Sequence, residues 1–383
     1  MGHSWRDSPA SWKTLHGVAA AIFVALATIV PAFASPALDQ GGDRTLTRAT
    51  NVKSEEDKRA LSWSGMNGST PRRRRHLTIS DLTSLQTAFG EYCSDPATAE
   101  STYGSIKNWD ISSVTSLDSL MASCSTASSF NADLSRWDVS AVNTFSQAFY
   151  YAESFDCDLS AWDTAASYKF YRTFRYAATF NGDISTWDIS RANSVAHMLA
   201  ETFMFNSDIS GWDISSVTDL SFILYSSAFN LDISAWDTSF VHTISYAFSY
   251  NTVFNQDLAS WDMSQVTEMV NTFRNCDSFN QNLASWNTSS LADMRNTFAD
   301  AYVFNGDISS WEVAKVTTMW QSFMGARSFN QDIRSWDVSS SSDMQNMFNG
   351  ALVFNQDLSA WDLASVTTIQ GAFGSTEAFN QVH

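Results

Sequence analysis

The sequence is poor in the residues on which most catalytic and metal sites depend. Its 383 residues include four cysteines and six histidines. The cysteines show no C-x-x-C metal spacing, and the histidines after residue 75 are widely scattered. The motifs G-x-S-x-G and H-E-x-x-H are absent, as is a glycine-rich phosphate loop. These absences argue against an enzyme, and we expect no catalytic residues.

Basic residues are also scarce after residue 75. Residues 76–383 hold 34 of the 40 acidic residues but only 11 of the 22 basic ones, which gives this part a formal charge of −23. A surface of that sign repels phosphate backbones, so nucleic acid is a poor partner, and cations or basic surfaces are better ones. The 44% hydrophobic content is enough to form a sizeable core.

The longest hydrophobic run is too short for a membrane span. It covers about 13 residues from Val18 to Val30, whereas a bilayer-spanning helix needs about 18 or more. Basic residues precede it, and an A-x-A cleavage pattern follows at residues 32–34. We predict a signal peptide over residues 1–34, cut after Ala34, and a secreted or cell-surface protein without a stable membrane span after cleavage. A retained anchor, a buried helix and a bipartite plastid-targeting signal are the alternatives.

Residues 35–75 are polar and show no sustained hydrophobic period, which predicts a disordered linker or pro-segment. The segment ends in four consecutive arginines. This run fits processing after Arg75 by a dibasic convertase, or else a basic tail that draws the chain to an acidic surface. Asn67 lies in Asn-Gly-Ser and is a candidate N-glycosylation site.

Tryptophan recurs about every 25 residues in the rest of the chain, which indicates a stacked repeat array. The eleven positions are Trp109, Trp137, Trp162, Trp187, Trp212, Trp236, Trp261, Trp286, Trp311, Trp336 and Trp361. In each repeat an L-x-x-W-x-V pattern predicts a short strand. Apolar residues then follow at spacings of 3, 4 and 3, as at Val142, Phe145, Phe149 and Ala152, which predicts a short helix with Ser140 at its N-cap.

A unit of this size cannot bury its apolar face alone, so neighbouring units must stack, with their strands paired in parallel. Parallel crossovers are almost always right-handed. The predicted fold class is therefore an α/β repeat solenoid. It is a right-handed coil of about eleven 25-residue units, with a parallel β-sheet on one face and short helices on the other. We place an N-terminal cap at residues 76–101 and the solenoid at residues 102–383.

The consensus F-N-x-D-[LI]-S-x-W-D-[VIT]-S-x-V-T-x-M-x-x-x-F-x-x-A, found over about residues 102–381, resembles the repeat of BspA-type leucine-rich-repeat surface proteins. The resemblance implies a leucine-rich-repeat-like solenoid, surface display and a role in adhesion or protein binding, without enzyme activity. The first copy departs from the consensus, and in the Trp286 copy Asn282 and Asn287 replace both acids.

We therefore expect a non-catalytic adhesion or protein-interaction scaffold that binds an extracellular protein or glycan. A hydrolase needs one distinct group of catalytic residues, whereas these repeats are nearly identical. The alternative is an extracellular glycan-binding or calcium-dependent carbohydrate-active protein. An exposed tryptophan column could stack on sugars, but its place in the apolar pattern favours burial.

Two columns of acidic residues flank the tryptophans. The candidates for a ligand-binding face follow each tryptophan directly: Asp138, Asp163, Asp188, Asp213, Asp237, Asp262, Glu312, Asp337 and Asp362. The second column lies four residues before each tryptophan, where neighbouring carboxylates could hold calcium; the candidates are Asp183, Asp208, Asp232 and Asp257. Without calcium, these aspartates would accept backbone N–H bonds in turns. No D-x-D-x-D-G loop supports calcium, and no other cofactor is expected.

The N-terminal cap is predicted to be joined to the first coil by a disulfide between Cys93 and Cys124, which an oxidising compartment would permit. The alternative is that Cys124 is a buried thiol. Asn287, in Asn-Thr-Ser, is a second candidate glycosylation site, and a glycan there would interrupt a ligand track along its column.

The chain stops at His383, before the repeat after Trp361 is complete. An uncapped last coil exposes unpaired backbone groups beside an apolar core. We therefore expect fraying or self-association through the C-terminal coil, unless further coils follow His383.

Overall fold

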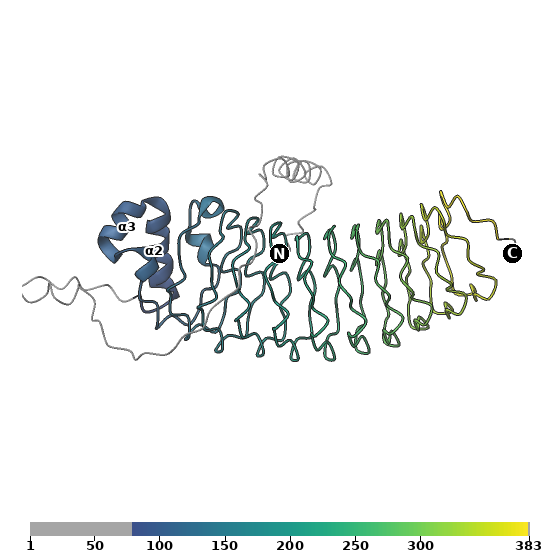
Figure 1. Ribbon diagram of the computed structural model, residues 1–383, viewed down its shortest axis with the longest axis horizontal. Helices are drawn as coiled ribbons and strands as arrows, with labels where there is room; N and C mark the ends of the chain where they lie inside the picture. Colours follow the sequence, from purple (N-terminus) through teal and green to yellow (C-terminus); the bar gives the residue numbers. More distant parts are fainter. Residues whose placement is uncertain (1–78, 382–383) are drawn as a thin grey trace, which may run out of the picture. The chain divides into compact units, whose positions relative to one another are not determined.

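The computed structural model describes residues 79–381. Its helices all lie near the start of this range: α2 (Leu82–Ser94), α3 (Pro96–Tyr103), and the short 3-10 helices η2 (Ile106–Asn108), η3 (Leu120–Ser123) and η4 (Ala127–Ser129). Beyond them the chain runs through a series of stacked coils (Figure 1). None of the helices within the described range is long and apolar enough to cross a bilayer.

Helix α2 begins at a complete capping box. The Asp81 side chain accepts a hydrogen bond from the Ser84 backbone, while the Ser84 hydroxyl accepts one from the Asp81 backbone. Asp95 then caps α3 through the N–H of Thr98, and Pro96 occupies the first turn of that helix. Both helices fall in or next to the segment predicted as the N-terminal cap, although α3 runs two residues past its boundary.

The repeats do not contain the strand and helix that the hydrophobic pattern predicts. Among residues 104–381 the coils have no strand, and their only helices are η2 to η4. Single parallel bridges join neighbouring coils, for example Thr243 with Glu268 and Glu268 with Asp293. These bridges lie seven residues after each tryptophan, inside the predicted helix rather than in the predicted strand.

The backbone hydrogen bonds of this stretch explain why no helix forms. In the coil of Trp261, alternate N–H groups donate to carbonyls of the next coil, namely those of Met269, Asn271, Phe273 and Asn275. The N–H groups between them donate to the carbonyl three residues earlier in their own coil, namely those of Thr272, Arg274 and Cys276. An α-helix would direct each N–H to the carbonyl four residues earlier. Seven of the eight N–H groups from Met269 to Cys276 are thus bonded, three within the coil and four to the next coil.

The predicted N-cap serines have a different role for the same reason. The backbone N–H and the hydroxyl of Ser140 both donate to Oδ1 of Asp138, at 3.1 and 2.6 Å. The serine therefore closes a tight turn after the aspartate instead of starting a helix.

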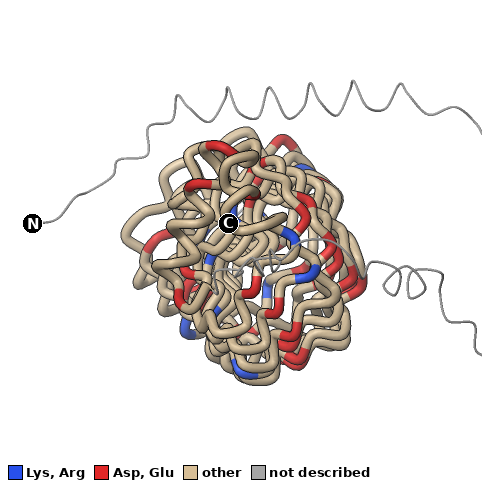
Figure 2. Tube along the Cα trace, turned by 90° about the vertical axis from the view of Figure 1, so that its left-hand side faces the viewer, with Lys and Arg blue, Asp and Glu red and all other residues tan. Residues whose placement is uncertain are grey.

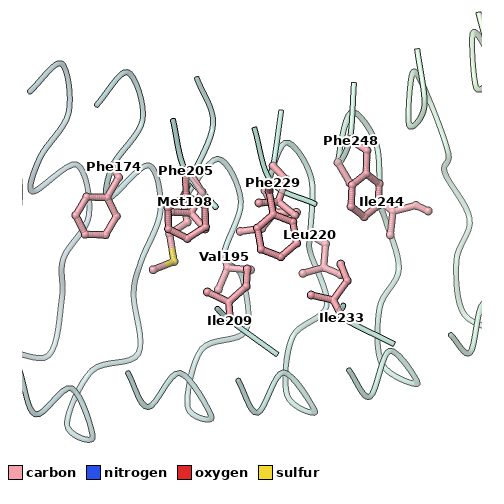
Figure 3. Packing of buried hydrophobic residues seen from close by; sticks show 14 of the residues in the cluster. Phe174, Val195, Met198, Phe205, Ile209, Leu220, Phe229, Ile233, Ile244 and Phe248 are labelled. Carbon is pink, nitrogen blue, oxygen red and sulfur yellow. The ribbon is translucent and has the colours of Figure 1, made fainter. Parts of the chain in front are cut away.

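A single apolar core runs through the coils. Equivalent phenylalanines stack from one coil to the next, with ring centroids 5.6 Å apart for Phe298 and Phe323 and 5.5 Å apart for Phe323 and Phe348. Figure 3 shows part of this core, where apolar side chains from successive coils point inward. Because each unit covers the apolar end of its neighbour, the core is continuous although each repeat is small.

A column of asparagines, six residues before most of the tryptophans, holds the coils in register. The N–H of Asn330 donates to Oδ1 of Asn305, and the N–H of Asn355 donates to Oδ1 of Asn330, both at 2.9 Å. Each asparagine thus satisfies a backbone donor of the following coil. The same bond joins Asn230 to Asn206 across a repeat that is one residue shorter, so it aligns neighbouring coils at this column even where the repeat length changes.

Candidate functional site

The tryptophan column belongs to the core. The indole of Trp311 is 3% exposed, stacks on that of Trp286 at 5.9 Å, and donates from Nε1 to the carbonyl of Leu283 at 3.0 Å. The same bond recurs from coil to coil. Because the indole faces and the N–H groups of this column are used inside the protein, they are not available to bind a sugar.

The column directly after each tryptophan is exposed. All nine ligand-face candidates, from Asp138 to Asp362, lie at the surface. Figure 2 shows acidic residues recurring at the same places on successive coils. At Asp213, the bonds from the hydroxyl and the backbone N–H of Ser215 lower the pKa of the carboxyl group. Each aspartate of this column is oriented by a backbone N–H two residues later.

The four calcium candidates serve similar turns. Asp183, Asp208 and Asp232 accept backbone N–H bonds from the serines two residues later, at 2.9, 2.9 and 2.8 Å. Asp257 accepts one from Ala259 at 2.9 Å. All four are exposed, and residues 79–381 contain no group of three or more acidic, histidine or cysteine side chains placed to hold a metal ion.

The predicted modification sites lie in different places. Asn287 is exposed in the column after the tryptophans and accepts the N–H of Ser289, like the aspartates around it. Asn67, Ala34 and Arg75 fall outside the described residues, as do the predicted signal peptide and linker.

The sulfurs of Cys93 and Cys124 form a disulfide, with the Cα atoms 5.2 Å apart. Cys93 lies on the buried face of α2, and Cys124 follows η3 in the first coil. The disulfide therefore ties the helical cap to the coil that it covers. Cys157 and Cys276 are free and buried.

Sequence reasoning missed a second surface, which is revealed by backbone conformation. Nearly every coil has left-handed residues ten and fourteen positions after its tryptophan. Glycine, asparagine and aspartate tolerate this conformation best, since other residues pay roughly 1–2 kcal/mol for it. In the coils of Trp261 to Trp361, eight of these ten residues are of those three types. In the coils of Trp137 to Trp236, none of the ten equivalent residues is glycine, asparagine or aspartate.

Eight of these ten positions, and several places next to them, carry bulky side chains instead. We call this region the tyrosine-rich surface; it comprises Tyr150, Tyr151, Tyr171, Arg172, Arg175, Tyr176, His197, Glu201, Phe222, Tyr225, Tyr246 and Tyr250. Their rings stack between coils. The centroids of Tyr151 and Tyr176 are 4.4 Å apart, and those of Phe222 and Tyr246 are 4.2 Å apart. Such stacks offset part of the backbone cost.

The charged residues of this surface are held in place. Arg175 donates two hydrogen bonds to the nearly buried carboxylate of Glu201, at 3.0 and 3.3 Å, and a third to the Tyr176 hydroxyl. Burial raises the pKa of Glu201, while the bond from Arg175 opposes that shift. The guanidinium of Arg172 lies 4.7 Å from the ring centroid of Tyr171.

His197 is neutral in this setting. Its ring lies 4.1 Å from that of Phe222, and its edge contacts Tyr171. Burial, together with the charges of Arg175 and Arg172, lowers the pKa of His197 to about 3. The signal for this surface was present in the sequence, because residues 167–177 read SYKFYRTFRYA, where other copies carry methionine and small polar residues.

The last described coil differs from the inner ones in exposure. Leu363, Ile369 and Phe373 are 47%, 54% and 38% exposed, and they border an apolar cavity of about 340 Å³ with Met344 and Trp361. Self-association through this coil stays a prediction.

Comparison with known families gives a match along most of the described chain. The model described as "Mycoplasma protein of unknown function, DUF285" matches residues 83–210, 195–308 and 282–383. Together the three overlapping matches cover residues 83–383. No curated protein and no solved structure matches significantly.

Proposed function

We propose a function for this chain, which belongs to the family described as Mycoplasma protein of unknown function, DUF285. The proposal is that it is a non-catalytic adhesion or protein-interaction scaffold displayed outside the cell. Its finer assignment, also a proposal, is to the BspA-type leucine-rich-repeat surface proteins. The 25-residue consensus supports that assignment, and the parallel bridges at the same spacing support a right-handed, leucine-rich-repeat-like solenoid.

The observation that carries the functional proposal is the exposed carboxylate column directly after the tryptophans. Its members recur in every coil from Trp137 to Trp361 except that of Trp286, and turns hold the aspartates in fixed orientations, as in the bonds from Ser215 to Asp213. A regular row of oriented charges suits a partner with a basic surface, because opposite potentials accelerate encounter and fix register. Nearly identical copies suit repeated weak contacts, whose combined strength exceeds that of each one.

Two matched variants of the full chain test this role. In the first, Asp163, Asp188, Asp213 and Asp237 are each changed to asparagine. In the second, the same change is made at Asp183, Asp208, Asp232 and Asp257. The fold should tolerate both, since Asn287 and Asn282 already form the same turns in these two columns. Each variant loses four negative charges, so overall charge is held equal between them.

The binding assay uses immobilised extracellular matrix proteins and glycans, with calcium or with a chelator. We expect the chain to bind basic matrix proteins, and the first variant to lose affinity at least about tenfold more than the second. Equal losses would reduce the effect to overall charge and overturn the assignment of the site. Loss confined to the second variant and dependent on calcium would favour the calcium-dependent alternative. Release of reducing sugar from a bound polysaccharide would contradict the non-catalytic assignment.

A further inference from the structure

The tyrosine-rich surface concentrates positive charge on an acidic molecule. Three of the eleven basic residues in residues 76–383, Lys169, Arg172 and Arg175, belong to the single coil of Trp162. Arg175 is neutralised by Glu201. Neither Lys169 nor Arg172 forms an ion pair with any residue of the described range, so two positive charges are unpaired there.

The outermost ring of this surface is open to a ligand. Tyr151 is 44% exposed, and Tyr176 covers one of its faces. Tyr150 meets it edge-on, and no other ring within residues 79–381 stacks on it. The inner rings, such as Phe222, have neighbours on both sides, and their packing accounts for them.

The same coils bear the backbone cost described above. Tyr151, Arg172 and Tyr176 are all left-handed, at φ 62°, 57° and 64°, where asparagine or glycine serves in later coils. A residue type that disfavours the left-handed conformation but occupies it suggests that its side chain has a function there. Stacking explains the pair of tyrosines, but Arg172 is not part of a ring stack between coils, and its Nε is buried without a hydrogen-bond partner among the described residues.

We infer that the coils of Trp137 and Trp162 bind a carboxylate-bearing saccharide, such as a chain of uronic acids. Arg172 pairs with the sugar carboxylate, since guanidinium and carboxylate match in geometry. The open face of Tyr151 packs against the apolar face of the sugar ring, and Lys169 adds a second positive charge. These residues differ from the carboxylate columns, so this inference does not rest on the proposed function.

A flexible saccharide fits this surface better than a folded acidic protein. A stable protein interface covers about 800 Å² on each partner, which would bring acidic partner groups against much of a molecule with strong negative charge. A saccharide chain contacts only a few coils. The remaining carboxylates act weakly on it, because salt screens charges beyond about 8–10 Å.

The test measures calorimetric binding of a hexamer of galacturonic acid to the full chain, with maltohexaose as the neutral probe and poly-L-glutamate as the acidic peptide. Arg172→Gln is compared with Arg327→Gln. Arg327 also lies over a tyrosine, 4.5 Å from the ring centroid of Tyr302, in a distant coil, so the two variants lose the same charge from similar pairs. Tyr151→Asn removes the ring and places a tolerated residue at a left-handed position.

We expect the uronate to bind and maltohexaose not to bind. Arg172→Gln should weaken uronate binding about tenfold and Arg327→Gln less than about twofold, because an ion-paired hydrogen bond is lost only in the first. Tyr151→Asn should weaken it at least about fivefold with no loss of thermal stability. Absence of uronate binding, equal effects of the two arginine variants, or equally tight binding of poly-L-glutamate would overturn the inference.

Discussion

Arg175 donates two hydrogen bonds, of 3.0 and 3.3 Å, to the carboxylate of Glu201 on the next coil. The Glu201 side chain is 8% exposed and the Arg175 side chain 17%. Removing one partner leaves the other charge nearly buried and alone. We predict that Glu201→Gln lowers the free energy of unfolding by about 3 kcal/mol, measured by denaturant titration at neutral pH.

The pair of Arg295 and Asp293 is the control for this prediction, because its side chains are more exposed, at 47% and 18%, and water screens it better. Arg295→Gln should cost less than about 1 kcal/mol. A Glu201→Gln variant no less stable than the Arg295→Gln variant would contradict the importance of the buried pair.

Two glycines separate backbone conformation from packing. Gly350 has φ +78°, and an added Cβ would meet only ordinary contacts, the nearest at 3.5 Å from Gly325 Cα. Gly350→Ala should therefore lower stability by about 1 kcal/mol through its left-handed backbone alone.

Gly211 is the matched position, since its φ is not in the left-handed range and no atom lies within 4 Å of its added Cβ. Gly211→Ala should raise stability by about 0.4–1 kcal/mol, because alanine restricts the unfolded chain. Thermal melting of both variants measures the difference. Similar shifts of the two melting temperatures would show that conformation is not what distinguishes these sites.

The repeat length and the buried tryptophans were accessible from the sequence, since a constant period places equivalent residues on one column. The local backbone was not. Phe145, Phe149 and Ala152 have helical spacing, yet overlapping turns bury residues at the same intervals. Hydrophobic pattern reports which side chains are inside, whereas the choice between helix and turns depends on whether each N–H bonds within the coil or to the next one.

The carboxylate columns were visible as repeated acids, because each copy has them. The tyrosine-rich surface was missed for the opposite reason. Its residues occur in only a few coils, so a consensus of all the repeats does not contain them. Asn271 and Gly350 at the left-handed positions of later coils were an available signal. Comparison with Tyr151 or Arg172 at the equivalent places would have identified the surface, since these residue types are unfavourable at a left-handed position.

His197 should make stability depend on pH. In the unfolded chain its pKa is close to 6.5, and in the folded protein burial and the charges of Arg175 and Arg172 lower the pKa to about 3. As pH falls below 6.5 the unfolded state binds a proton that the folded state does not, so folding is destabilised. The slope from this residue is at most about 1.4 kcal/mol per pH unit.

His197→Asn removes the titrating group and suits the left-handed backbone, where His197 has φ 58°. Denaturant titrations at pH values between 7 and 5 stay above the range where ordinary carboxylates titrate. The variant should lose less stability than the natural chain over this interval. Parallel pH profiles for the two proteins would show that His197 does not resist protonation.

The disulfide between Cys93 and Cys124 should stabilise the cap and the first coil but not the distant coils. It closes a loop with a sequence separation of 31, for which the loss of entropy in the unfolded chain corresponds to about 3–4 kcal/mol. In a stacked array each unit contacts its neighbours only, so the effect should be local.

Changing both cysteines to alanine should therefore speed hydrogen exchange at Leu85 and Phe89 in α2, and leave the coil of Trp311 unchanged. A reducing agent should reproduce this in the natural chain and have no effect on the variant, whose remaining cysteines are free. Faster exchange throughout the coils would instead mean that the array unfolds as one cooperative unit.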